Sequence, residues 1–89
     1  MNPIADALLA VMASRAGDAT GARHHLAAAQ HHAQTAARRH RQVVEIARLV
    51  VAGDRQRAEG LALVHATEVP DDAELLARIT GTDTPQDTR

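Results

Sequence analysis

The chain has 89 residues, of which 45% are hydrophobic, it contains no Phe, Tyr, Trp or Cys, and its formal net charge is −1. This composition excludes disulfides, a thiolate nucleophile and Cys-based zinc sites, and the near-neutral charge gives no general attraction to nucleic acid. Because no apolar run reaches the length of a membrane span or a signal-peptide core, we expect a cytoplasmic protein that does not insert into membranes.

The first predicted helix spans residues 3–15. Asn2 is a common N-cap residue, and Pro3 suits the first helical position, where a backbone N–H has no partner inside the helix. Gly17 is expected to end the helix, since a glycine often follows a helix C-terminus in the left-handed conformation.

The next segment allows two interpretations. Asp18 can cap a second helix, and from there to Gly53 the only glycine is Gly21 and there is no proline. A turn near Gln34-Thr35 would divide this stretch into two helices and give four to five helices in antiparallel hairpins. Without that turn, the protein would be a three-helix arrangement with one long central helix. We favour the turn, because the repeat described below requires it.

The C-terminal part is predicted to hold two more helices. Asp54 is expected to cap the first of them, and Pro70 separates it from the second. The pattern Asp71-x-x-Glu74 resembles a capping box for a final short helix over 72–80.

The length supports one small domain, which we expect over residues 1–81. Its core must be aliphatic, and the Ala content of about a fifth favours helices whose axes approach closely. The remaining residues, 82–89, are polar and are expected to form a disordered tail. All basic residues are Arg and none is Lys, which is typical of GC-rich bacterial genomes.

A short pattern occurs twice, as Ala16-Gly17-Asp18-x-x-x-Ala22 and, 36 residues later, as Ala52-Gly53-Asp54-x-x-x-Ala58. A helical unit repeated at this period is typical of solenoid proteins. Over about residues 4–80 the chain resembles the tetratricopeptide repeat, in which Gly and a polar residue end the first helix and a small residue five positions after that Gly opens the packed face of the second. The resemblance implies hairpin units over about 3–34 and 36–69.

The resemblance also implies a function. Tetratricopeptide-like proteins bind other proteins, and the first helix of each hairpin lines their concave surface. The implied partner-binding residues here are Val11, Ser14, Arg15, His40, Val43, Ala47 and Val50. Their apolar character indicates an apolar helical or extended segment as the ligand, so we expect a non-catalytic interaction or adaptor module.

The segment around Val43–Val51 is apolar on most of its circumference, so it is also consistent with a central helix surrounded by its neighbours. If part of it is exposed, Val43, Ala47 and Val50 would mediate self-association. An alternative function is a small dimeric regulatory protein that acts on a transcription factor or on nucleic acid through Arg38-Arg39-His40-Arg41. Nucleic-acid binding is the weaker expectation, because no aromatic side chain can stack on bases.

Histidine doublets at His24-His25 and His31-His32 lie on one predicted helix. Seven residues correspond to a rise of about 10.5 Å, whereas a metal-chelating pair on a helix is spaced four residues apart. We therefore expect a solvated face and no metal or cofactor, with His24, His31 and His65 as the ligand candidates if a hairpin brings them together. No phosphate loop, nucleophile elbow or zinc-protease motif is present, so an enzyme is not expected.

Overall fold

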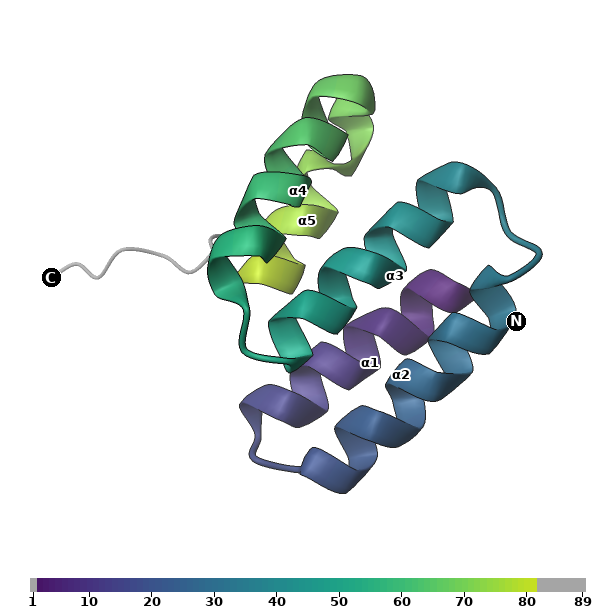
Figure 1. Ribbon diagram of the computed structural model, residues 1–89, viewed down its shortest axis with the longest axis vertical. Coiled ribbons are helices and arrows are strands. Elements are labelled where there is room, and N and C mark those ends of the chain that lie inside the picture. The colour runs from purple at the N-terminus through teal and green to yellow at the C-terminus, as the bar shows by residue number, and fades with distance from the viewer. Residues whose placement is uncertain (1, 82–89) are drawn as a thin grey trace, which may run out of the picture.

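The computed structural model describes residues 2–81, and all the regular structure in this range is helical (Figure 1). The all-α fold class expected from the sequence is confirmed. The predicted tail at 82–89 lies outside the described residues. In chain order the elements are α1 (Pro3–Arg15), α2 (Ala19–Ala33), α3 (Arg38–Val51), α4 (Arg55–Glu68), the 3₁₀ turn η1 (Pro70–Asp72) and α5 (Ala73–Thr80).

The chain turns between α2 and α3, so the alternative with one long central helix is wrong. Ala37 is extended, with φ −63° and ψ 156°, and α3 starts directly after it. The Arg41 guanidinium donates a hydrogen bond of 2.7 Å to the Ala36 carbonyl and fastens the turn. No Gly or Pro marks this turn. The helix breaks because α3 can bury its broad apolar surface only by folding back onto α1 and α2.

The two copies of the repeated pattern fold alike. Gly17 and Gly53 adopt φ of 81° and 85°, a left-handed conformation in which other residues are strained. The Asp18 carboxylate accepts a hydrogen bond of 2.8 Å from the Gly21 amide, and Asp54 accepts one of 3.3 Å from the Arg57 amide. Each copy therefore ends one helix and caps the next within three residues.

The last helix begins differently from the prediction. The predicted cap, Asp71, lies inside η1, and the N-cap of α5 is Asp72, whose side chain makes no capping hydrogen bond, so the proposed capping box is wrong. The Asp72 carboxylate instead accepts hydrogen bonds from Arg39 on α3 and His65 on α4. The carboxylate at the start of α5 therefore serves a tertiary contact and not a local cap.

α3 lies at the centre of the fold. It packs against α1 and α2 on one side and against α4 and α5 on the other (Figure 1). The apolar residues of α3 that are buried are Val43, Val44, Ile46, Ala47 and Leu49. The expectation of a surrounded central helix is thus confirmed.

Two arginines from different helices hold the C-terminal end of α5. The Arg15 guanidinium donates hydrogen bonds of 2.7 and 2.9 Å to the carbonyls of Arg78 and Ile79. Arg55 donates one of 3.1 Å to the carbonyl of Thr80. Positive side chains at a helix C-terminus satisfy its last carbonyls and oppose the negative end of its dipole. The short α5 is therefore tied to α1 and α4.

Candidate binding groove

Three of the residues predicted to bind a partner have no exposed surface. Val11, Val43 and Ala47 are each 0% exposed and belong to one core cluster that joins α1 and α3. A side chain inside the core contacts no partner, so the assignment of these three is wrong. The apolar character that suggested a groove reflects packing on all sides of α3.

The other predicted binding residues do not form an apolar surface. Ser14 and His40 are half-buried, and the half-buried Val50 packs against the core. Arg15 is exposed, but its guanidinium is occupied by the end of α5. Self-association through Val43, Ala47 and Val50 therefore has no support in this fold.

An apolar groove of about 390 Å³ lies instead between α4 and α5. Small side chains dominate its walls, and the lining residues are Glu59, Ala62, Leu63, Ala66, Ala73, Leu76, Ala77 and Thr80. The alanines come in pairs four residues apart, Ala62 with Ala66 on α4 and Ala73 with Ala77 on α5. Because residues at this spacing share a helix face, each pair forms one smooth wall. This spacing was the available sequence signal for the groove.

One exposed apolar residue, Leu63, lies at the rim of the groove. Leu63 is 72% exposed and the adjacent Val64 is 55% exposed, both on α4. Leu9 and Met12 are also exposed, but they lie on α1 and do not line the groove. Isolated exposed apolar residues are common on protein surfaces, but Leu63 also lines a hollow with apolar walls, as a binding site requires.

A buried polar network joins α4 to α3 and to the start of α5. His65 on α4 is completely buried, and its Nε2 lies 2.7 Å from Asp72 Oδ2 while its Nδ1 lies 2.6 Å from Gln42 Oε1. Arg39 donates from Nε to Asp72 Oδ2 at 2.8 Å and from its terminal nitrogen to Oδ1 at 2.5 Å. The network links α3, α4 and η1, and so it sets the position from which α5 starts.

The same contacts control the ionisation of Asp72. Its paired hydrogen bonds from Arg39, together with the bond from His65, outweigh the opposing effect of burial and lower the pKa of Asp72 from 3.8 to about 2. The carboxylate is therefore charged at neutral pH. Although His65 and Asp72 form an imidazole–carboxylate pair, no substrate reaches a fully buried ring, and the pair serves as a structural link.

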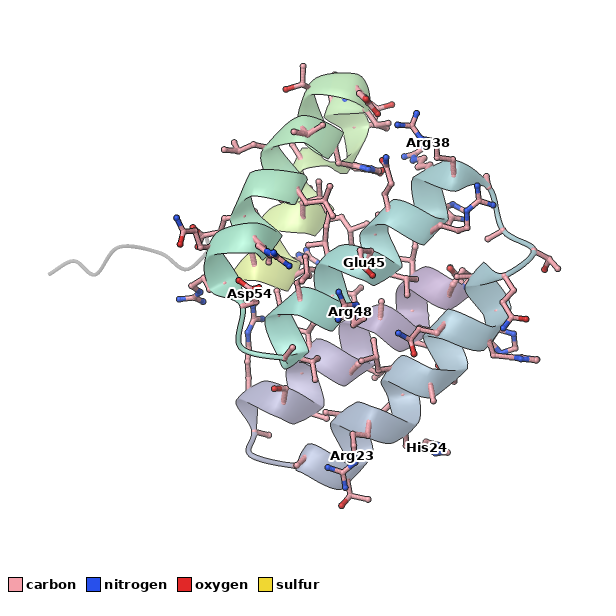
Figure 2. All side chains as sticks on the ribbon, viewed as in Figure 1. Arg23, His24, Arg38, Glu45, Arg48 and Asp54 are labelled. Carbon is pink, nitrogen blue, oxygen red and sulfur yellow. The ribbon has the colours of Figure 1, made fainter. Side chains whose placement is uncertain are left out.

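The candidate metal ligands do not come together. His24 and His31 lie on the exposed surface of α2, and Figure 2 shows His24 at the edge of the molecule away from α4. His65 lies across α3 from them, with both ring nitrogens already hydrogen-bonded. Within residues 2–81, no group of three or more His, Cys, Asp or Glu residues is arranged to hold a metal ion.

The basic cluster at the start of α3 is largely occupied by contacts inside the protein. Arg38 lies 3.6 Å from the Glu68 carboxylate at the end of α4, Arg39 binds Asp72, and Arg41 binds the Ala36 carbonyl. Figure 2 shows Arg38 at this α3–α4 end of the molecule. Carboxylates thus offset the charges of Arg38 and Arg39, whereas Arg41 bonds to a neutral carbonyl and keeps its charge.

Glu45 and Arg48 of α3 also pair with each other, with bonds of 2.9 and 2.6 Å from Arg48 to the Glu45 carboxylate (Figure 2). The bond from Arg48 lowers the pKa of Glu45 below its ordinary value. Glu45 and Arg48 thus offset each other's charge on α3, whereas the α4–α5 groove is apolar.

None of the helices in residues 2–81 is long and apolar enough to cross a membrane. Comparisons with protein-family models, with curated proteins and with solved structures each found no match to this chain. The feature of the fold that bears most directly on function is the apolar groove between α4 and α5.

Proposed function

We propose that this protein is a non-catalytic protein-interaction module that binds an apolar helical segment of a partner in the groove between α4 and α5. The observation that supports this proposal is the groove itself, whose walls are Ala and Leu side chains and whose rim carries Leu63, 72% exposed. An apolar hollow beside a large exposed apolar side chain is favoured to lose its water to a complementary surface.

A helix suits this groove better than an extended segment does. An extended peptide must find partners for its backbone N–H and C=O groups, and the groove is lined almost entirely by apolar side chains. A helix satisfies its own backbone and presents only side chains. The low Ala walls let such a helix approach closely, with larger side chains such as Leu or Met filling the hollow.

The proposal keeps the interaction role implied by the tetratricopeptide resemblance and moves the site. That resemblance remains a proposal, supported by the two like-folded turns at Gly17 and Gly53. We also propose a cytoplasmic location, since a chain without cysteine gains nothing from an oxidising compartment. The alternative role on nucleic acid is not favoured, because Arg38 and Arg39 of the basic cluster already face carboxylates and no aromatic side chain can stack on bases.

The test is a selection from a displayed library of random peptides of about 16 residues, long enough for four helical turns. We expect the recovered peptides to carry Leu, Ile or Met at positions spaced three and four apart. Binding should weaken at least about tenfold in Leu63→Glu, which places a charge at the rim, and should be unchanged in Met12→Glu, whose parent residue is 59% exposed on α1. Peptides that bind both variants equally well would refute the groove assignment.

A further inference from the structure

We infer that the side-chain amide of Gln42 turns over when the buried imidazole of His65 gains or loses a proton, so that the network stays hydrogen-bonded in both states. The inference does not depend on the proposed function. It concerns the contacts that hold α3, α4 and η1 together and that set the start of α5, which forms one wall of the groove. A ring that titrates without losing a hydrogen bond keeps this wall in place at either charge.

The ring of His65 has a partner at each nitrogen although it has no exposed surface. Its Nε2 lies 2.7 Å from Oδ2 of Asp72, and its Nδ1 lies 2.6 Å from Oε1 of Gln42. A neutral imidazole has one N–H donor and one acceptor nitrogen, whereas an imidazolium donates from both nitrogens. The partners of His65 must therefore fit two different arrangements of protons.

Asp72 fits the same arrangement in both states, because it only accepts. Arg39 donates to both oxygens of its carboxylate, and this pairing together with the bond from His65 lowers the pKa of Asp72 to about 2. The carboxylate is therefore ionised at any pH at which a histidine titrates. A hydrogen bond to an ionised carboxylate needs a donor, so Nε2 keeps its hydrogen in the neutral and in the charged ring. The proton that is gained or lost is the one on Nδ1.

Gln42 suits a nitrogen that changes from donor to acceptor. Its amide has an oxygen acceptor on one side and an NH₂ donor on the other, and a half-turn about the last side-chain bond exchanges them. A protonated Nδ1 donates to the amide oxygen, and a bare Nδ1 accepts from the turned NH₂ group. Because Gln42 is half-buried, water can reach the side of the amide that points away from the ring.

A partner fixed in one role would leave the ring unmatched in one of its states. Within residues 2–81, every buried side-chain nitrogen or oxygen has a hydrogen-bond partner. A polar group that loses its partner in the protein interior destabilises the folded state. Rotation of the Gln42 amide avoids that loss, and it needs no movement of α3 or α4.

The charged groups that face the ring are Arg39 of α3 and Asp72 of η1. The Arg39 side chain is 47% exposed, so solvent screens its repulsion of a charged ring, whereas the buried Asp72 carboxylate contacts the ring directly. The other charged or titratable residues at this end of α3, α4, η1 and α5 are exposed or half-buried: Arg38, His40, Arg41, Glu68, Asp71 and Glu74. A protonated His65 therefore has an ionised partner at bonding distance.

The direct experiment is ¹⁵N NMR of the ring nitrogens of His65 in the full chain, from about pH 4.5 to about pH 8.5, a range that spans the titration of a histidine. We expect Nε2 to stay protonated throughout, while Nδ1 gains a proton as the pH falls. This measurement uses the wild-type protein and depends on no substitution.

Two substitutions confine position 42 to one role. Gln42→Glu offers Nδ1 only acceptors, so its carboxylate favours the charged ring and raises the pKa of His65 in the folded variant. The unfolding equilibrium constant of this variant, relative to that of the wild type, should fall as the pH is lowered from about 8 to about 5.5. Gln42→Met leaves a buried N–H without an acceptor, which lowers the folded-state pKa, so its relative unfolding constant should rise over the same range.

Each of these changes should be about fivefold for a displacement of one unit in the pKa of His65, measured by urea denaturation at both pH values. The other histidines are present in every variant, so their titration cancels in the comparison with the wild type. Gln56→Glu and Gln56→Met make the same chemical changes at an exposed position of α4, and their stability relative to the wild type should not depend on pH.

Three results would each overturn the inference: an Nδ1 that keeps one proton state over the whole range, an Nε2 that loses its proton, or Gln42 variants whose stability follows the wild type at both pH values. Circular dichroism checks that the variants are folded. None of these results concerns the binding of peptides in the groove, so failure here is distinct from failure of the proposed function.

Discussion

Asp72 is the residue whose replacement tests the structure most directly. Its carboxylate joins Arg39 on α3 and His65 on α4 to the start of α5, and its side chain is 6% exposed. Asp72→Asn keeps the volume but removes the charge and half of the acceptor capacity. The variant leaves the buried His65 or Arg39 with a weaker partner, and either loss destabilises the folded state.

The magnitude follows from the pKa of Asp72. A carboxyl whose pKa is 3.8 in the unfolded chain and about 2 in the folded protein contributes about 2 kcal/mol at neutral pH. For a domain of this size, that loss lowers Tm by roughly 10 °C. Asp71→Asn is the matched control, since Asp71 is the exposed neighbour of Asp72. We expect its effect to stay within about 0.5 kcal/mol.

The pH dependence has a definite sign. Because folding lowers the pKa of Asp72, its contribution is present above pH 4 and is lost as the pH falls through 4 towards 2. The difference in stability between wild type and Asp72→Asn should therefore shrink to roughly half its neutral value at pH 3. Urea denaturation followed by circular dichroism measures it at both pH values. A difference below about 0.5 kcal/mol at pH 7, or an equal difference at pH 7 and pH 3, would refute the proposed role of the network.

Two further predictions concern helix ends. Gly53→Ala should lower the free energy of unfolding by about 1 kcal/mol, because φ of 85° strains a residue with a Cβ. Gly60→Ala, inside α4, should raise it by about 0.5 kcal/mol. A stabilising Gly53→Ala would place that glycine within a helix. Arg15→Gln should speed hydrogen exchange of the α5 amides about fivefold, because the end of α5 loses two hydrogen bonds. Arg23→Gln, on the exposed surface of α2, should leave this exchange unchanged. Equal exchange rates in both variants would contradict the proposed role of Arg15 in holding α5.

The helical elements and their boundaries at the repeated turns could be predicted from the sequence, because their causes are local. Glycine at 17 and 53 permits a left-handed residue, and Asp18 and Asp54 cap the amides that follow within three residues. The Ala-rich composition without Phe, Tyr or Trp favoured helices packed around an aliphatic core. None of this depends on which helix lies beside which.

The exposed and buried sides of the helices could not be assigned in the same way. Val43 and Ala47 are apolar in any arrangement, and only the packing of α1 against α3 places them in the core. The groove is equally a product of tertiary structure, because neither the α4 alanines nor the α5 alanines form a hollow until the two helices lie together.

The clearest difference between local and tertiary control is at residues 65 to 72. By sequence, Asp72 belongs to the start of a helix and His65 to a possible metal site. In the fold, Arg39 approaches from 33 residues away and binds the Asp72 carboxylate, which in turn binds His65. The sequence alone determined the two repeated turns and the caps at Asn2, Asp18 and Asp54, whose interactions span a few residues. Only the tertiary structure decided which polar groups pair and which apolar faces remain open, because both depend on residues that the chain brings together from distant positions.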